Sequence, residues 1–403
     1  MKIALIKETK VPVDNRVAFS PKQMAQLQKE YPEHQFVVQK SDVRAFSDEE
    51  YFSAGLPLVD RVDDCDVLFG IKEAQIDTLI PHKHYVFFGH IAKMQEYNRP
   101  LLQAFIQKGI TFTDYEYMVD EKGIRVCAFG WWAGVVGVYY TLRGYGLRHQ
   151  LYNLPKPDRR FTLEGLKEAL KSVKLPAVKI LVTGAGRVSQ GAQYILDEIG
   201  AERMSEEQFL NTIQVPKLSY VVADVDCLVK RADGESFSWS HFTHHASEYQ
   251  SDFMRWARCA DVLLCAHFWA PDAPVYLSAD DLKDPSLRIR MIGDVTCDIQ
   301  GSVKSTLRPA THEEPYYDYN PLTGGEEPAF SNMSNITVMA VDTCPNALAM
   351  DTSAYFGEML MQHVMPGLLS GNHGEVVQRG TILRNGQLTP RFDYLDAFAK
   401  NEK

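Results

Sequence analysis

The segment Val178–Ala192, VKILVTGAGRVSQGA, constrains the possible folds more than any other part of the sequence. An apolar run with strand character passes directly into a glycine-alanine-glycine turn and then into a helix. Gly184 permits the tight turn, and Gly186 lets the main chain approach a pyrophosphate without a Cβ in the way. The helix start at Arg187 and Val188 offers free N–H groups and the positive end of the helix dipole. These four residues are therefore predicted to bind a dinucleotide.

The remainder of the nucleotide fingerprint departs from the usual pattern. Position 189 holds Ser189 where a third glycine is common, so Gly191 is expected to provide the close helix–strand packing. An acid about 20 residues further on usually binds the ribose hydroxyls. Glu206 and Glu207 stand near that place, and we predict Glu207 as the ligand, although a solvated surface explains both nearly as well. No arginine follows directly to hold a 2′-phosphate, which favours NAD over NADP.

Strand-like and helix-like segments alternate on both sides of this motif, which predicts an α/β protein with mostly parallel sheets. The polar, turn-rich segment 312–331 is expected to be a loop, and a helix is expected over Ser353–Gly371. The strands expected in the first part of the chain are 2–8, 34–40, 65–73, 84–90 and 110–119, with helices expected over 21–31, 47–55 and 97–109.

Composition excludes several classes of protein. The length of 403 residues predicts two domains, and a net charge of −10 argues against nucleic-acid or anionic-membrane partners. Seven cysteines without a CxxC pair indicate neither a disulfide framework nor a metal site, and they fit a reducing cytoplasm. The N-terminus lacks the apolar stretch of a signal peptide. The apolar run Val126–Leu142 is shorter than the roughly 20 residues of a membrane helix and is expected to be a buried helix.

Ionisable residues follow several of the predicted strands in the first part of the chain. The carboxyl ends of parallel strands meet at one edge of a sheet, so we expect these side chains to converge there. Arginines can bind carboxylates with two parallel hydrogen bonds, and a lysine with a histidine can exchange protons with an amine or carbinolamine. The set suits redox chemistry on an amino or keto acid. Its members are Arg16, Lys72, Glu73, His90, Lys93, Glu116 and Arg125, and Asp294 and Asp298 follow a strand in the second part of the chain.

The order of the motifs resembles the alanine dehydrogenase and transhydrogenase superfamily. The matching segments are KETKVPVDNRVAFSP, VLFGIKE, FFGHIAK, the glycine turn and DVTCDIQGS. Within that superfamily, FGHIAK and YEYMVDEKGIRVCAFGWWAGVVG are most similar to the lysine-forming, NAD-dependent saccharopine dehydrogenases. The resemblance extends over nearly the whole chain.

The resemblance implies two Rossmann-like domains with an active site in the cleft between them. The first, catalytic domain would be discontinuous, with residues 1–130 completed by 335–403, and residues 131–334 would form the dinucleotide-binding domain. The implied reaction, part of lysine metabolism, is the oxidative cleavage of saccharopine to lysine and 2-oxoglutarate. Hydride passes to NAD, and the resulting imine is hydrolysed.

By motif position, the resemblance also assigns roles to individual residues. Lys72 and His90 match an acid–base pair, and Glu73 and Glu116 match carboxylates that tune it. Arg16 and Arg125 match groups that bind the substrate carboxylates, and Lys93 is grouped with them. Asp298 matches an aspartate on the nicotinamide side. The site residues thus implied for the substrate and cofactor include no metal ligand.

Three other functions remain open at this stage. An alanine dehydrogenase-like enzyme would use pyruvate and ammonia, for which Arg125 with Glu116 would be superfluous. A nucleotide-binding regulator would bind NAD(H) without turnover. A transhydrogenase-like subunit would need a membrane partner.

Overall fold

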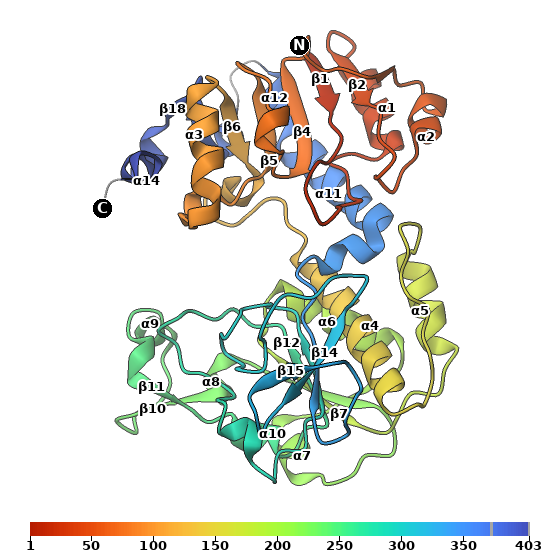
Figure 1. The fold of residues 1–403 in the computed structure, drawn as a ribbon, viewed down its shortest axis with the longest axis vertical. Coiled ribbons are helices and arrows are strands. Elements are labelled where there is room, and N and C mark those ends of the chain that lie inside the picture. The colour runs from red at the N-terminus through yellow and green to blue at the C-terminus, as the bar shows by residue number, and fades with distance from the viewer. Residues whose placement is uncertain (371–373, 402–403) are drawn as a thin grey trace. The chain divides into compact units, whose positions relative to one another are not determined.

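The computed structural model describes residues 1–370 and 374–401, and the chain divides into two compact units (Figure 1). Unit 1 comprises Met1–Phe129 and Leu348–Lys403, and unit 2 comprises Gly130–Ala347. The second boundary lies thirteen residues beyond the expected one at 334/335. The reason is strand β16, Ile336–Met339, which pairs with two strands of unit 2 and keeps this segment there.

Unit 1 is built on an eight-stranded sheet with the order β18-β17-β6-β5-β4-β1-β2-β3. Strands β1 to β6 are parallel to their neighbours, and the hairpin β17–β18 joins β6 in antiparallel fashion. The mostly parallel sheet predicted from the alternating segments is confirmed. The strands are β1 Lys2–Leu5, β2 Gln35–Gln39, β3 Leu58–Val59, β4 Val67–Lys72, β5 His84–Phe88, β6 Thr111–Asp114, β17 Thr381–Arg384 and β18 Gln387–Leu388.

Helices cover this sheet and include the C-terminal segment of the chain. Helix α1 starts at a capping box in which Ser20 and Gln23 satisfy each other's main-chain N–H groups. The helices are α1 Pro21–Glu30, α2 Asp48–Ser53, α3 Arg99–Gln107, α11 Ala349–His363, α12 Met365–Leu369, α13 Glu375–Gly380 and α14 Leu395–Lys400. The 3-10 turns are η1 Ile76–Thr78, η2 Ile91–Lys93, η3 Glu96–Asn98, η4 Tyr115–Tyr117 and η8 Pro390–Phe392.

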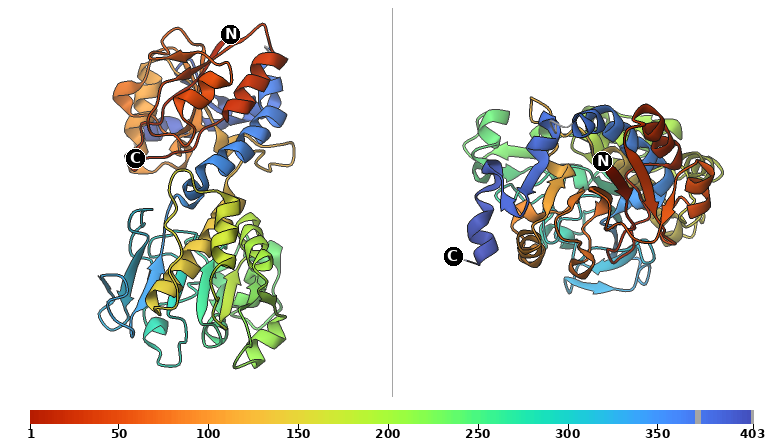
Figure 2. Two further views of the ribbon diagram at one scale, coloured as in Figure 1. Left: turned by 90° about the vertical axis from the view of Figure 1, so that its right-hand side faces the viewer. Right: turned by 90° about the horizontal axis from the view of Figure 1, so that it is seen from above.

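Hydrogen bonds attach the returning segment to the N-terminal part of unit 1. The main-chain N–H of Val17 donates to Ser353 Oγ over 2.9 Å, and Gln23 Nε2 donates to the carbonyl of Ala354 over 2.7 Å. Helices α1 and α11 consequently lie side by side (Figures 1 and 2). The helix expected over 353–371 is divided at Val364, because Pro366 has no N–H with which to continue it. Gly371 lies outside the described residues.

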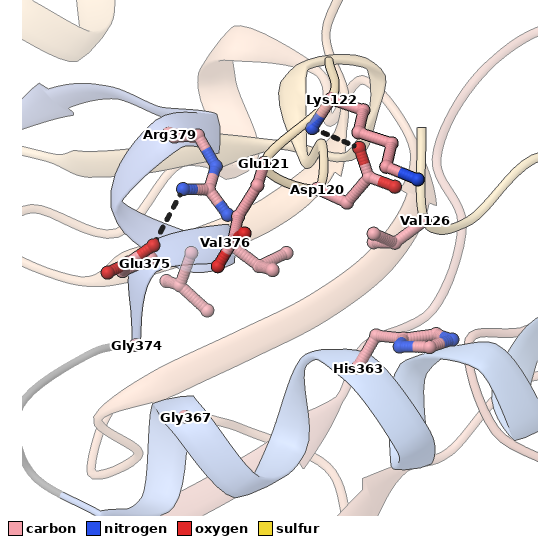
Figure 3. A pocket seen from close by; sticks show the side chains of 11 residues that line it. Asp120, Glu121, Lys122, Val126, His363, Gly367, Gly374, Glu375, Val376 and Arg379 are labelled. Carbon is pink, nitrogen blue, oxygen red and sulfur yellow. Dashed lines mark hydrogen bonds and ion pairs between the residues drawn. The ribbon is translucent and has the colours of Figure 1, made fainter. Parts of the chain in front are cut away.

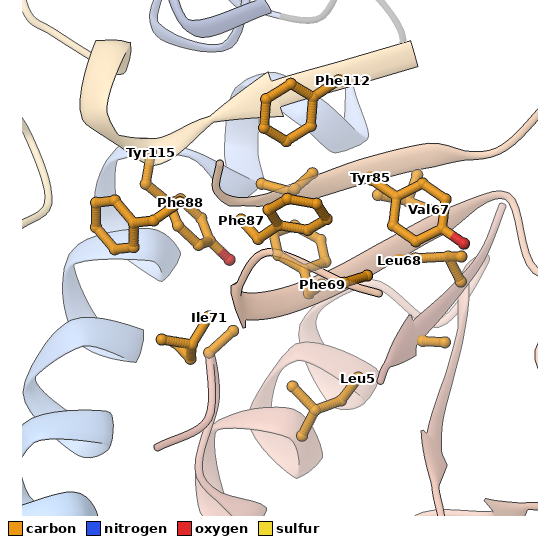
Figure 4. Packing of buried hydrophobic residues seen from close by; sticks show 14 of the residues in the cluster. Leu5, Val67, Leu68, Phe69, Ile71, Tyr85, Phe87, Phe88, Phe112 and Tyr115 are labelled. Atoms are coloured by element: carbon orange, nitrogen blue, oxygen red, sulfur yellow. The ribbon is translucent and has the colours of Figure 1, made fainter. Parts of the chain in front are cut away.

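Aromatic side chains from neighbouring strands form much of the core of unit 1 (Figure 4). The ring centroids of Phe87 and Phe112 are 4.9 Å apart, and those of Phe88 and Tyr115 are 5.1 Å apart. These contacts join β5 to β6 and η4 just before the residues predicted to be functional. The close packing therefore gives the ends of these strands a rigid support.

Unit 2 contains a second eight-stranded sheet, with the order β15-β14-β16-β13-β12-β7-β9-β8. Six of these strands are parallel, from β8 to β16, and the sheet together with its helices has the layout of a Rossmann-like domain. The strands are β7 Lys179–Thr183, β8 Glu202–Arg203, β9 Ser219–Ala223, β12 Val262–Cys265, β13 Met291–Asp294, β14 Tyr316–Asn320, β15 Gly325–Glu327 and β16 Ile336–Met339, with a separate pair β10 Val229–Arg231 and β11 Tyr249–Ser251. The helices and 3-10 turns are α4 Gly130–Arg148, α5 Leu163–Lys171, α6 Arg187–Glu198, α7 Glu206–Asn211, α8 Val225–Leu228, α9 Trp239–Phe242, α10 Met254–Ala257, η5 Ala246–Glu248, η6 Asp281–Lys283 and η7 Cys344–Leu348.

The loop expected over residues 312–331 is wrong at two places, because it contains both strands of a hairpin, β14 and β15. Residues Tyr316–Asn320 form β14, which pairs with both β16 and β15. Aromatic side chains favour strands, and Tyr317 and Tyr319 are buried in the core of unit 2. The proline and glycines after Asn320 therefore mark a hairpin turn rather than a long loop.

Helix α4 is the buried helix expected from the apolar run, and α6 packs directly against it. A Cβ built on Gly134 would lie 1.8 Å from the carbonyl oxygen of Val188, and one on Gly191 would lie 1.8 Å from that of Trp131. The glycines therefore allow the two helix backbones to touch. Gly191 serves helix–helix packing and not the helix–strand packing expected for it. Among the described residues, no helix is both long enough and apolar enough to cross a bilayer.

Candidate active site

Lys72 ends strand β4 at an irregularity of the sheet. Phe69 lies opposite Val86 of β5 and Lys72 lies opposite Phe88, so β4 has one extra residue over this interval. Extra residues of this kind bend a strand and change the direction of the side chains that follow. The end of β4 is therefore shaped to aim Lys72.

Arg16 forms a buried ion pair with Asp14. Its Nη2 lies 2.5 Å from Asp14 Oδ2, its Nε lies 2.9 Å from Oδ1, and its guanidinium carbon stacks 4.3 Å from the ring centre of Phe129. Burial tends to raise the pKa of Asp14, but the charge of Arg16, aided by that of Lys72, holds the pKa below its usual value. Arg16 and Lys72, both predicted site residues, thus act on Asp14, an acid that was not predicted from the sequence.

Glu73 lies between Lys10 and His90. It forms an ion pair with Lys10, and its Oε2 is 3.8 Å from Nδ1 of His90, which is beyond hydrogen-bond length. Burial acts to raise the pKa of Glu73, but the imidazole of His90 and the ammonium of Lys10 outweigh it and hold the pKa at about 2. Glu73 therefore stays ionised near neutral pH and places a negative charge close to the imidazole.

His90 has a strained backbone that a buried carboxylate holds in place. Its φ is 55°, in the left-handed region that residues other than glycine seldom adopt. The N–H groups of Gly89 and His90 donate to Asp114 Oδ2 over 3.0 and 3.2 Å, and the N–H of Glu116 donates to Oδ1 over 2.8 Å. Burial raises the pKa of Asp114 to about 6. Asp114 thus fixes two predicted site residues at once. The only sequence signal for it is an acid at a strand end.

Glu116 lies between two of the predicted cations. Its Oε1 is 3.1 Å from Lys93 Nζ and 2.8 Å from Arg125 Nη2, and only 10% of its side chain is exposed. Both cations are about half exposed, so solvent and small molecules can reach them. A mostly buried carboxylate with two accessible cations can orient an anionic substrate.

The unit 1 residues predicted from the sequence therefore fall into three contacting groups. Lys72 and Arg16 act on Asp14, His90 faces Glu73, and Lys93 and Arg125 bind Glu116. Three buried side-chain atoms of these groups have no hydrogen-bond partner among the described residues: Glu73 Oε2, His90 Nδ1 and Glu116 Oε2. Buried polar atoms without partners are uncommon and are typical of functional sites.

A separate hollow of about 420 Å³ lies between α13, α11 and the turn after η4 (Figure 3). It is lined by exposed charged groups, including the ion pair of Arg379 and Glu375, with His363 at one side. Of the described residues that line it, none belongs to the predicted site. It does not extend the groups above.

The glycine turn of unit 2 has the geometry expected of a phosphate-binding turn. Gly184 has a φ of 83°, and a Cβ there would lie 2.7 Å from the Cα of His267. Gly186 precedes α6, and a Cβ built on it meets no atom within 4 Å, so the space above the turn is open. Arg187 and Val188 begin the helix, as predicted from the sequence. Open space at a helix start suits a pyrophosphate.

His267 supports the same turn from the neighbouring strand. Its Nδ1 is 2.6 Å from the hydroxyl of Thr183, and its Nε2 is 2.8 Å from that of Ser302. Burial lowers the pKa of His267 to about 3, so the ring is neutral at neutral pH. Its role is to hold the turn rather than to exchange protons.

Glu207 and Asp224 occupy different places relative to β7. Glu207 lies in the first turn of α7, after the two-residue edge strand β8. Strand β7 lies between β12 and β9, and Asp224 follows the last residue of β9. In Rossmann-like domains the acid that binds ribose follows the neighbouring strand. Because β8 and α7 are inserted between β7 and β9, Asp224 lies further along the chain than the spacing rule expects for such an acid.

Asp298 lies in the loop that follows β13. Asp294 is buried and accepts hydrogen bonds from the hydroxyls of Thr296 and Thr306, over 2.6 and 2.5 Å. Burial raises the pKa of both Asp294 and Asp298. Asp294 therefore shapes the loop that carries Asp298. Within residues 1–370 and 374–401, no cluster of three or more His, Cys, Asp or Glu side chains could hold a metal ion.

Comparisons with known proteins agree with this architecture. Residues 4–136 match the family model described as "Alanine dehydrogenase/PNT, N-terminal domain". The chain is 27% identical to the mitochondrial alpha-aminoadipic semialdehyde synthase of Bos taurus, over 92% of this chain and 45% of that protein. It is 26% identical to the saccharopine dehydrogenase [NAD(+), L-lysine-forming] of Neurospora crassa, over 91% of this chain and 90% of that one. The chain thus spans about half the length of the semialdehyde synthases it matches.

Solved structures confirm the fold. An L-alanine dehydrogenase superposes with a TM-score of 0.67 at 17% identity, covering 99% of this chain and all of that one. A transhydrogenase from Sinorhizobium meliloti gives a TM-score of 0.57 at 14% identity, covering 96% of this chain and all of that one. The predicted pair of Rossmann-like domains is therefore confirmed. Residues 4–136 thus resemble the N-terminal domain of the alanine dehydrogenase/PNT family, and nearly the whole chain is similar to saccharopine dehydrogenases.

Proposed function

We propose that this protein is an NAD-dependent oxidoreductase that cleaves or forms a secondary amine between an amino acid and a 2-oxo acid. The specific reaction proposed is the conversion of saccharopine to L-lysine and 2-oxoglutarate, or its reverse. The relatives named for saccharopine and semialdehyde chemistry support this proposal. The observation that carries it is the convergence of Lys72, His90 and Glu116 at the carboxyl ends of β4, β5 and β6.

Unit 2 supplies the residues that would hold the dinucleotide. The turn of Gly184 and Gly186 and the start of α6 at Arg187 and Val188 fit a pyrophosphate, because the space above Gly186 is open. We propose Asp224 as the ribose ligand, since it follows the strand beside β7. Glu207 stays a prediction for that role. When bound, NAD accepts the hydride from the carbon next to the amine nitrogen.

In the cleavage direction, Lys72 takes the proton of the secondary amine as the hydride leaves, which gives a substrate imine. Lys72 returns that proton to the imine nitrogen while His90 takes a proton from the attacking water, which gives a neutral carbinolamine. His90 then donates its proton to the amine nitrogen as the carbon–nitrogen bond breaks, and the hydroxyl proton of the carbinolamine passes to Lys72 and on to solvent. Glu73 stabilises the imidazolium formed on the way, because its pKa of about 2 keeps it ionised. Asp114 keeps His90 and Glu116 in position through its three main-chain hydrogen bonds.

Arg125 and Lys93 would bind the carboxylates of the substrate, whereas Arg16, which is buried and paired with Asp14, stays a prediction for that role. Arg125 and Lys93 are accessible and already share one acid, Glu116, so a dicarboxylate can approach both. A monocarboxylate such as pyruvate needs fewer cations. Arg125 with Glu116 therefore favours the saccharopine reaction over the alanine dehydrogenase reaction.

The absence of paired cysteines among the described residues fits a reducing compartment, and we propose that the protein works in the cytoplasm on small molecules. Asp298 is proposed to lie on the nicotinamide side, as its motif position implies. A regulator that binds NAD(H) without turnover is the alternative from another class. The site residues would then have no effect on any rate.

The proposal is tested by following the oxidation of NADH at 340 nm with the purified protein. Parallel reactions contain 2-oxoglutarate with lysine, 2-oxoglutarate with other amines, and pyruvate with ammonia, and each is repeated with NADPH. We expect rapid loss of absorbance with NADH, 2-oxoglutarate and lysine. Activity with pyruvate and ammonia would instead assign the protein to alanine dehydrogenase chemistry. Tight NADH binding without turnover on any pair would support the regulator.

A further inference from the structure

Strand β4 extends beyond the strand that flanks it on one side. Main-chain pairing between β1 and β4 ends where Leu5 lies opposite Phe69, and the last bond runs from the N–H of Ile6 to the carbonyl of Phe69 over 2.9 Å. Strand β4 continues for three more residues, to Lys72. Over these residues the N–H groups that face β1 have no partner strand.

The side chain of Glu8 takes the place of that strand. Its Oε1 accepts the N–H of Ile71 over 2.6 Å, and its Oε2 accepts the N–H of Lys72 over 2.9 Å. Successive N–H groups of a regular strand point to opposite sides, whereas these two point to the same carboxyl group. The extra residue of β4 over this interval makes that arrangement possible.

A second side chain holds the same irregularity from the other side. The hydroxyl of Tyr115 donates to the carbonyl of Gly70 over 3.0 Å. Figure 4 shows Tyr115 and Ile71 in the same part of the core. Three main-chain groups of the last β4 residues are thus bound by side chains from two other segments, so the end of the strand cannot relax independently.

We propose that Glu8 is a positioning residue for Lys72: by binding the main chain of the last two β4 residues in place of β1, it sets where the Lys72 side chain is held. The expected effect of Glu8 on turnover rests on the proposed role of Lys72. The expected effect of Glu8 on the position of the Lys72 side chain does not depend on any activity.

The charges around Glu8 indicate that its role is geometric and not that of a counter-ion. Burial raises the pKa of Glu8 to about 8, Asp14 acts in the same direction, and Arg16 opposes it. Glu8→Gln keeps the size and shape of the side chain and replaces one hydrogen-bond acceptor by an amide N–H₂ donor, so it tests the two main-chain hydrogen bonds.

The test observes Lys72 directly. Lysines of the intact protein are labelled by reductive ¹³C-methylation, and the Lys72 signal is assigned by NMR with Lys72→Arg. We expect Glu8→Gln to move the Lys72 signal while the signal of Lys93, in the same unit, stays in place. Glu121→Gln, the same chemical change at an exposed acid, should move neither signal. An unmoved Lys72 signal in Glu8→Gln, or equal movement of Lys93, would overturn the proposal.

Kinetics and stability provide the second measurement. In the reaction that the wild type supports, Glu8→Gln should lower kcat about 10- to 100-fold, as small misplacements of catalytic groups do, and leave KM for NADH within about two-fold. Glu8→Ala, which removes both acceptors, should lower kcat at least as much. A kcat equal to wild type in Glu8→Ala, with thermal unfolding showing a folded protein, would overturn the proposal. If the wild type turns over no substrate pair, the function proposed above fails, and the Lys72 signal alone decides the role of Glu8.

Discussion

Replacing Asp114 by Asn should disturb stability and activity together, because one buried carboxylate holds two parts of the site. Oδ2 accepts the N–H groups of Gly89 and His90, and Oδ1 accepts that of Glu116. Asn keeps one acceptor oxygen. If the Asn oxygen takes the place of Oδ2, only the N–H of Glu116 loses its acceptor. If it takes the place of Oδ1, the N–H groups of Gly89 and His90 both lose theirs.

The expected loss of stability follows from that count. A buried N–H without an acceptor costs about 1–3 kcal/mol, so the first orientation is preferred and Asp114→Asn should lower the free energy of unfolding by about 1–3 kcal/mol. For a unit of this size each kcal/mol lowers Tm by about 2–4 °C. The main-chain N–H of Glu116 is the group that loses its acceptor, so Glu116 is displaced and kcat should fall about 10- to 100-fold. The affinity for NADH should not change, because the glycine turn lies in unit 2.

Urea unfolding and the 340 nm assay measure both effects. Asp120→Asn is the matched control, because a single oxygen of Asp120 accepts the N–H groups of Lys122 and Ile124, and Asn can reproduce both bonds. The control should stay within about 0.5 kcal/mol of wild type. Wild-type stability together with wild-type turnover in Asp114→Asn would refute the reasoning that these hydrogen bonds position the site.

Four further changes have defined outcomes. Arg125→Ala should raise KM for 2-oxoglutarate about ten-fold or more by removing a charged hydrogen bond, and an unchanged KM in steady-state assays would contradict its role. Gly186→Val should abolish binding of NADH by filling the open space above the turn, and retained enhancement of NADH fluorescence in a folded variant would count against this. Gly191→Ala should lower stability by about 1–3 kcal/mol in urea, because its Cβ would meet the carbonyl of Trp131, and wild-type stability would show that the α4–α6 contact is looser than described. The folded-state pKa of Glu73 lies below its unfolded value, so the stability that its ionised form contributes is present above about pH 4.5 and is lost as pH falls toward about 2. Glu73→Gln should therefore be less stable than wild type at pH 7, and the difference in unfolding free energy should narrow as pH falls from about 4.5 to about 2. A difference that does not depend on pH would contradict this.

Local patterns in the sequence predicted the parts of the fold that depend on local geometry. The glycine turn at Gly184 and Gly186 follows from backbone requirements alone, so its place between β7 and α6 could be predicted. Parallel topology brings strand ends to one edge, so convergence of the polar residues there could be expected, but their division into groups such as Glu116 with Lys93 and Arg125 could not. These predictions need no knowledge of which distant residues meet.

Residues that act through distant contacts could not be predicted in this way. Asp114 matters because of three main-chain N–H groups, and main-chain groups leave no trace in the sequence. Asp224, which we propose as the ribose ligand, follows β9, one of the two strands that pair with β7, but β8 and α7 intervene in the chain, so the spacing rule does not reach it. Gly191 was assigned to a strand contact because its helix partner, α4, is distant in sequence. In each case the missing information was which segments pair.

The most direct test of the proposed reaction is to trace the transferred hydrogen. The protein is incubated with 2-oxoglutarate, lysine and NADH carrying deuterium at C4 of the nicotinamide, in separate samples for each face, and the products are analysed by mass spectrometry. We expect one face to deliver its deuterium to a product whose mass is that of lysine plus 2-oxoglutarate, less water, plus one hydrogen and one deuterium. No such product from either face, or deuterium appearing only in alanine when pyruvate and ammonia are supplied, would contradict it.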